Sequence, residues 1–152
     1  MIEFDDLNPK GYELTSEQEG NAKDLLSAVN AFLEGYTGKV YVTSGIRDMA
    51  DHMRIYAAKG ITDESKIPMG SRHLFGLAVD LADPNRELAY YILNHLELLQ
   101  TCGLWVEHLN WTKGWIHLQS VSPKSKRRFF IPSNNPPEDS FWDGVYDAKY
   151  DK

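Results

Sequence analysis

Two histidines and one aspartate in this chain are of the residue types that build a catalytic metal centre. His73 and Asp80 lie in the segment SRHLFGLAVD at residues 71–80, and His117 lies in WIHL at residues 115–118. Two neutral imidazole nitrogens and one carboxylate oxygen suit Zn²⁺ and leave a fourth coordination position for water. An open position distinguishes catalytic from structural zinc, so these residues suggest a zinc hydrolase.

His73 and Asp80 are seven residues apart, and the residues between them indicate a turn and a strand rather than a helix. Gly76 permits a turn between them, and Asp80 falls in an apolar strand-like run at residues 78–81. A carboxylate there is costly to bury unless it is paired or binds a metal. The alternative from spacing alone is that Asp80 is a turn or capping residue and His73 a surface residue.

His117 lies in a second strand-like run at residues 115–119. Alternation along a strand places Trp115, His117 and Gln119 on one face. Taken alone, a histidine in this setting is more often a half-buried strand residue than a metal ligand.

Length and composition predict one globular domain that spans residues 1–152. The chain is 42% hydrophobic and carries a formal net charge of −6. This charge argues against a nucleic-acid-binding protein, whose binding face is usually basic. No apolar run approaches the roughly 20 residues needed to cross a bilayer. We therefore expect a monomer with neither nucleic acid nor membrane as partner.

The first six residues, MIEFDD, are acidic and lack the basic start and apolar stretch of a signal peptide. This pattern predicts a protein that is cytoplasmic as synthesised. If its target lies outside the membrane, another factor must release it.

Hydrophobic periodicity and capping signals predict an α+β fold, with helices flanking a small, mostly antiparallel sheet. His95 falls on the apolar stripe of the third helix and is expected in the core. Residues 123–152 are expected to form an extended C-terminal tail that packs on the body. The predicted helices are 16–34, 48–59 and 83–100, and the predicted strands are 39–43, 78–81, 104–109 and 115–119.

Three motifs follow one another along the chain. They are Thr-Ser-Gly-Ile-Arg at 43–47, Ser-x-His-x-x-Gly-x-Ala-x-Asp at 71–80, and Trp-x-His at 115–117. Together they resemble motifs of the LAS metallopeptidases, which comprise D-alanyl-D-alanine carboxypeptidases and L-alanyl-D-glutamate endopeptidases acting on bacterial cell-wall peptides. Residues 51–84 and 127–132 are most similar to small phage-encoded members.

The resemblance implies a DD-peptidase or hedgehog-like fold and one catalytic zinc ion held by His73, Asp80 and His117. It also implies that Arg47 contacts a substrate carboxylate or the developing oxyanion, a task that suits an always-charged planar donor. Ser71 corresponds to the motif serine, which binds substrate or orients a ligand. The alternative for Arg47 is a plain surface salt bridge.

The general base is where this chain departs from the family pattern. Many members carry Glu or Asp three residues before the last histidine, but here that position is Gly114. If the hairpin is centred on Thr112, Glu107 faces His117 across the two strands, with Cβ atoms about 4.5–5.5 Å apart. Glu107 is then the candidate base that takes a proton from water and passes it to the leaving amine. A register slip of one residue would favour His108 instead.

Glu107 also has a purely structural alternative, an exposed strand residue that pairs with Lys113. The function we expect is a zinc peptidase that cleaves an amide bond in peptidoglycan stem peptides, of the phage endolysin type. L-alanyl-D-glutamate endopeptidase is favoured over D-Ala-D-Ala carboxypeptidase, because cutting inside the stem serves lysis better than trimming its end. Two other hypotheses remain open: a non-catalytic cell-wall-binding module on the same scaffold, and a hydrolase of a non-wall amide.

Overall fold

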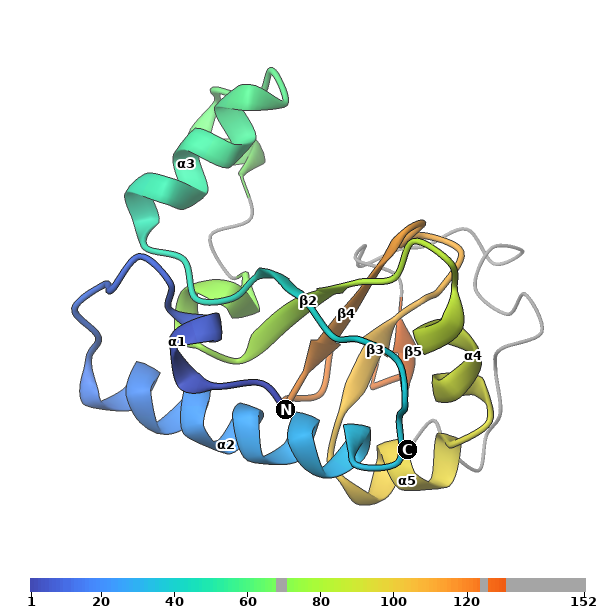
Figure 1. Ribbon diagram of the computed structural model, residues 1–152. Coiled ribbons are helices and arrows are strands. Elements are labelled where there is room, and N and C mark those ends of the chain that lie inside the picture. Colours follow the sequence, from blue (N-terminus) through green and yellow to red (C-terminus); the bar gives the residue numbers. More distant parts are fainter. Residues whose placement is uncertain (68–70, 124–125, 131–152) are drawn as a thin grey trace.

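The computed structural model describes residues 1–67, 71–123 and 126–130, and shows helices against one mixed sheet (Figure 1). The helices are α1 (Phe4–Leu7), α2 (Ser16–Leu33), α3 (Met49–Ala58), α4 (Glu87–Leu93) and α5 (Leu96–Thr101), and the 3₁₀ turns are η1 (Glu64–Lys66) and η2 (Arg72–Phe75). The strands are β1 (Val42–Ser44), β2 (Ala78–Ala82), β3 (Trp105–Glu107), β4 (Trp115–Gln119) and β5 (Phe129–Phe130). The predicted α+β class, with a mostly antiparallel sheet, is confirmed.

The sheet has the strand order β1-β2-β4-β3-β5, so β2, β4 and β3 lie inside it and β1 and β5 form its edges. All neighbouring strands are antiparallel except β3 and β5, which run parallel. The β3–β4 hairpin pairs Trp105 with Gln119 and Val106 with Leu118. This is the register predicted from a hairpin centred on Thr112.

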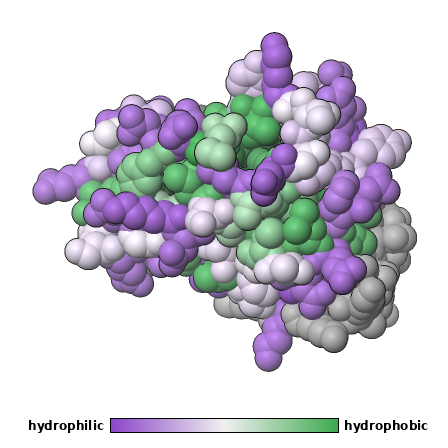
Figure 2. Space-filling model, turned by 60° about the horizontal axis from the view of Figure 1, so that its bottom comes forward, coloured by the Kyte–Doolittle hydropathy of each residue, from purple (hydrophilic) through white to green (hydrophobic). Residues whose placement is uncertain are grey.

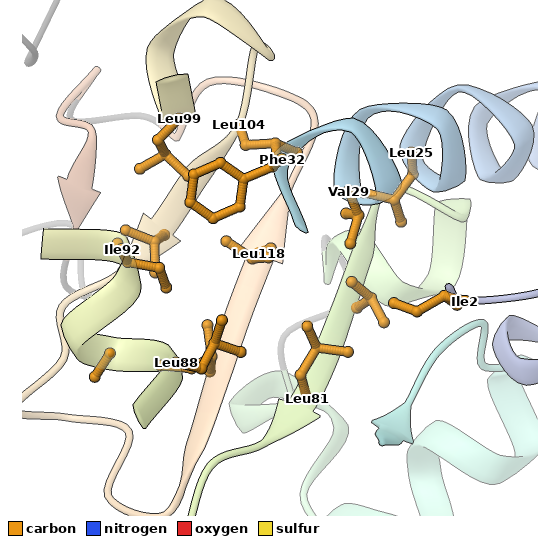
Figure 3. Packing of buried hydrophobic residues seen from close by; sticks show 14 of the residues in the cluster. Ile2, Leu25, Val29, Phe32, Leu81, Leu88, Ile92, Leu99, Leu104 and Leu118 are labelled. Carbon is orange, nitrogen blue, oxygen red and sulfur yellow. The ribbon is translucent and has the colours of Figure 1, made fainter. Parts of the chain in front are cut away.

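One face of the sheet forms the hydrophobic core with α2, α4 and α5, as Figure 3 shows for Leu81 and Leu118. Because strand side chains alternate between faces, the apolar positions of β2 and β4 point toward the helices while the polar residues between them point away. α2 contributes Leu25, Val29 and Phe32, each at most 1% exposed. Burying each of these side chains contributes about 1.5–3 kcal/mol.

The N-terminus of α2 is capped by two neighbouring side chains. Thr15 accepts a hydrogen bond from the Gln18 backbone amide, and the Gln18 side chain reaches back to the Thr15 amide. These two residues form the capping box of the helix. The same reciprocal pairing satisfies two backbone donors that the first turn of a helix leaves open.

The predicted third helix is two helices, α4 and α5, which meet at Asn94 and His95. His95 is exposed, so its expected place in the core was wrong. The carboxylate of Asp83 accepts hydrogen bonds from the Leu88 and Ala89 amides, both at 2.9 Å, and so satisfies two backbone donors in the first turn of α4.

Within the predicted C-terminal segment 123–152, the structure describes residue 123 and residues 126–130. Phe129 and Phe130 form β5 and extend the sheet beyond β3. Arg128, 4% exposed, donates to the carbonyl of Leu104 at 2.8 Å and so fixes the entry to this strand. The aromatic part of the predicted tail lies outside the described residues.

Helix α3 projects from the body of the molecule, while α2 runs along the core side of the sheet (Figure 1). Asp51 of α3 bonds to Lys10, Tyr12 and Arg54, which ties the base of this helix to the N-terminal loop. Seen from the side of α2 and α5, polar and apolar side chains are intermixed on the surface (Figure 2). Among the described residues, no helix combines the length and apolarity required to cross a membrane.

Candidate metal centre

A row of polar residues crosses the sheet on the face opposite the core. Asp80 of β2 pairs with Ser44 of β1 on one side and with His117 of β4 on the other. The β3–β4 register, continued by one residue, places Glu107 opposite His117. Residues opposite one another on neighbouring strands project from the same face. Four separate strands therefore contribute one line of side chains.

His73 joins this row from η2, the turn that precedes β2. Its Nε2 lies 3.3 Å from Oδ1 of Asp80, and Nδ1 of His117 lies 2.8 Å from the same oxygen. The two imidazole rings meet edge to face with centroids 5.2 Å apart. One ligand atom from each of the three residues lies within 4.8 Å of the others. The structure thus brings together the three residues singled out by the sequence.

This donor set could hold a metal ion. Ligands about 2.1 Å from a tetrahedral zinc lie about 3.4 Å from one another, close to the spacing seen here. His73 and Asp80 are buried, with 4% and 8% of their surface exposed. The interpretation of His73 as a surface residue and Asp80 as a turn residue is therefore excluded.

The orientation of His73 depends on Gly45, at the end of β1. The Nδ1 atom of His73 donates to the Gly45 carbonyl oxygen at 2.8 Å, because a carbonyl can only accept. The lone pair of Nε2 consequently faces Asp80. A hydrogen bond from the second ring nitrogen to a backbone carbonyl is a common way to orient a metal-binding histidine.

The ionisation of the three residues is strongly coupled. Burial alone would raise the pKa of Asp80, but its close contacts with His117 and His73 hold that pKa well below its usual range. Burial lowers the pKa of His73, and contact with Asp80 offsets this only in part. Burial also disfavours charge on His117, yet Asp80 and Gln119 raise its pKa overall. An ionised carboxylate and a neutral His73 are the forms that bind a metal.

Glu107 is buried beside this group, with 8% of its surface exposed. Its pKa is raised to about 7, mainly because burial disfavours the charged form. The positive charge of His117 opposes this shift, and the negative charge of Asp80 adds to it. The alternative in which Glu107 is an exposed strand residue paired with Lys113 was wrong. A carboxyl group that titrates near neutrality is suited to both take and return a proton.

Gly114 lies at the position where many LAS metallopeptidases carry a carboxylate, and its backbone conformation accounts for the glycine. Its φ is +83°, and nothing lies within 4 Å of the position a Cβ would occupy. Residues with a side chain avoid this left-handed region. The tight turn before β4 therefore disfavours a glutamate or aspartate at this position, and the role of Glu107 as the base remains a prediction.

Arg47 lies at the edge of the centre, where β1 leads into α3. Its Nη2 is 3.9 Å from Oδ2 of Asp80, and its Nε donates to the Ser44 hydroxyl at 3.1 Å. Its backbone amide also donates to the His73 carbonyl at 3.2 Å. Ser71 precedes η2, and its hydroxyl does not cap that turn. The substrate-binding roles predicted for Arg47 and Ser71 remain predictions.

Sequence reasoning missed several neighbours of the centre. Gln119 bonds to His117, a contact foreshadowed only by their shared strand face. Tyr56 of α3 and Lys59, the C-cap residue of this helix, interact electrostatically with Glu107, and Lys59 Nζ lies 4.9 Å from the centroid of the Tyr56 ring. Nothing in the spacing of α3 relative to β3 predicted that this helix borders the site.

Comparison with known proteins yields one structural similarity. No family model and no curated protein matches this chain. Among solved structures, the L-Ala D-Glu endopeptidase ChiX of Serratia marcescens is similar over 74% of this chain and 92% of its own, with 22% sequence identity and a TM-score of 0.48. A similarity at this level supports no argument about substrate or mechanism.

Proposed function

We propose that this protein is a zinc-dependent peptidase that hydrolyses an amide bond in peptidoglycan stem peptides. The observation that carries the proposal is the convergence of His73, Asp80 and His117 on one face of the sheet, with Glu107 in the same row. The three motifs that position these residues are those that resemble the LAS metallopeptidases.

His73, Asp80 and His117 would hold the zinc ion. Bound zinc supplies a Lewis acid for a carbonyl oxygen and lowers the pKa of water toward neutrality. A Glu107 carboxylate oxygen accepts a proton from the attacking water and delivers it to the leaving amine. The guanidinium of Arg47 donates to a substrate carboxylate or to the developing oxyanion, where a charged planar donor is most effective.

Within this class we favour L-alanyl-D-glutamate endopeptidase activity of the phage endolysin type. The residues similar to small phage-encoded members, 51–84 and 127–132, support this choice. D-Ala-D-Ala carboxypeptidase activity is the second candidate, since the same motifs occur in both groups. The two differ in product: the endopeptidase exposes a new D-glutamate amine inside the stem, and the carboxypeptidase releases free D-alanine.

The test is digestion of purified bacterial walls by the full chain, with zinc content measured on the same sample. Mass spectrometry of the soluble products then distinguishes the two bonds. We expect about one zinc per chain, cleavage by wild type, and a loss of about 10²–10⁴-fold in rate for Glu107→Gln. Arg47→Lys should lower kcat/KM, since it keeps the charge but loses the planar fork.

His95→Gln is the matched control, because this exposed histidine lies outside the centre and should leave rate and zinc content unchanged. Zinc binding without hydrolysis of wall peptides would contradict the proposal and favour the binding module. Cleavage unaffected by Glu107→Gln would remove Glu107 from the mechanism.

A further inference from the structure

Gln119 lies two residues after His117 on β4, on the same face, and is 3% exposed. Its Nε2 donates to the carbonyl oxygen of Val121 at 2.8 Å, and its Oε1 lies 2.9 Å from Nε2 of His117. Its backbone is held on both sides, because it pairs with Ala78 of β2 and with Trp105 of β3. The side chain therefore extends from a fixed point in the sheet.

The Val121 carbonyl determines which way the Gln119 amide points. A carbonyl oxygen can only accept, so the Gln119 NH₂ group must face Val121 and its Oε1 must face His117. The reversed amide would place two carbonyl oxygens against each other and leave both without a donor. Burial makes such an arrangement costly. It follows that Nε2 of His117 carries a proton and donates to Gln119.

We infer that Gln119 is a positioning residue that holds His117 in the tautomer with Nδ1 free to bind the metal. Nδ1 is the nitrogen that faces Asp80, at 2.8 Å from Oδ1; it donates to that carboxylate in the metal-free protein and would release its proton on metal binding. The inference rests on the proposed metal centre and adds a specific prediction about it. His73 binds through Nε2 and His117 through Nδ1, and each is oriented by a hydrogen bond from its other nitrogen.

Two independent acceptors thus hold the two histidines in opposite tautomers, with the proton on Nδ1 of His73 and on Nε2 of His117. The Gly45 backbone carbonyl serves His73, and the Gln119 side chain serves His117. Only the second can be removed by mutation without altering the main chain. Loss of such an acceptor typically costs about 10–100-fold in metal affinity.

The test compares wild type with Gln119→Leu and Gln119→Glu. Zinc affinity is measured by competition with a chromophoric chelator, and the tautomer of His117 by ¹⁵N-edited NMR of the zinc-loaded protein. In wild type we expect a proton on Nε2 of His117 and on Nδ1 of His73. Gln119→Leu should weaken zinc binding by about 10–100-fold. Gln119→Glu retains the acceptor for His117 and should keep its tautomer, but it loses the donor to the Val121 carbonyl and should therefore lower the stability of the protein.

The substitution Gln100→Leu, at a half-buried position of α5 outside the centre, is the control and should change neither quantity. A wild-type spectrum with the His117 proton on Nδ1 would overturn the inference, even if Gln119→Leu fails to fold. Unchanged zinc affinity in a folded Gln119→Leu variant would overturn it as well. Wild type that binds zinc through Nδ1 but does not cleave wall peptides would refute the proposed function alone. Wild type that binds no zinc would refute both.

Discussion

The carbonyl oxygen of Gly45 accepts a hydrogen bond from Nδ1 of His73 over 2.8 Å, between residues 28 positions apart. The same segment is held against α1, because the Ile46 amide donates to the Leu7 carbonyl at 2.8 Å. The segment after β1 therefore connects the N-terminal helix to His73 of the candidate metal centre. This connection gives a physical reason for the glycine in the Thr-Ser-Gly-Ile-Arg motif.

Gly45→Ala should destabilise the protein and weaken zinc binding together. A Cβ at this position would overlap the carbonyl oxygen and Cα of Leu7. Backbone must move to accommodate it, and overpacking of this kind costs about 1–3 kcal/mol. Because Gly45 also orients His73, we expect the zinc affinity to fall. Urea unfolding and chelator competition measure the two effects.

Gly20→Ala is the matched control for that substitution. Gly20 lies within α2, and nothing lies within 4 Å of its Cβ position. The change should stabilise the protein by about 0.5–1 kcal/mol, since alanine is the better helix former. Equal effects at residues 20 and 45 would contradict the role assigned to Gly45.

Gly114→Ala should destabilise the protein by about 1–2 kcal/mol through its backbone alone. The φ of +83° disfavours any side chain, and no neighbouring atom would clash with the new Cβ. Gly114→Glu should show a similar loss and should not restore activity to Glu107→Gln. Thermal unfolding and wall digestion test the two statements, and recovery of activity in the double variant would show that the turn tolerates a base at this position.

The pKa of Glu107 predicts a pH dependence of stability in the metal-free protein. Its folded pKa is raised from 4.5 to about 7. Below pH 4.5 the group is protonated in both states and has no effect. Between these values the unfolded chain ionises while the folded protein does not, so stability falls as pH rises, by at most about 1.4 kcal/mol per pH unit. Above pH 7 the loss is complete.

Glu107→Gln removes this contribution and isolates it from those of the histidines and Asp80. The free energy of unfolding of the variant, relative to wild type, should rise between pH 4.5 and pH 7 and then level off. Urea unfolding in the presence of EDTA measures this difference. Parallel curves for the two proteins across that range would show that the folded pKa of Glu107 is not raised.

Zinc removal should lower the melting temperature, and readdition should restore it. A ligand at 100 times its dissociation constant stabilises the folded state by about 2.7 kcal/mol. His117→Ala should abolish the response to zinc, whereas His95→Ala on the surface should retain it. Scanning calorimetry at several zinc concentrations provides the measurement. A response that survives His117→Ala would show that the ion binds elsewhere.

Much of the architecture followed from local pattern. The periodicity of α2, the Asp48 cap of α3 and the alternation in β4 each reflect interactions between residues close in the chain. The β3–β4 register was likewise predictable, because a hairpin of given length has few possible pairings. The break between α4 and α5 was not, and with it the exposure of His95. Nothing in the apolar periodicity marks that break.

The sequence by itself determined the ligand types, their motifs, and the strand faces on which Asp80 and His117 lie. Only the tertiary structure decided that His73 reaches Asp80, that Glu107 is buried with a raised pKa, and that Gln119 and Gly45 orient the two imidazoles. The physical reason is the sequence distance over which each interaction acts. Alternation and capping act between near neighbours, whereas desolvation and hydrogen bonds across strands depend on which distant segments the folded chain brings into contact.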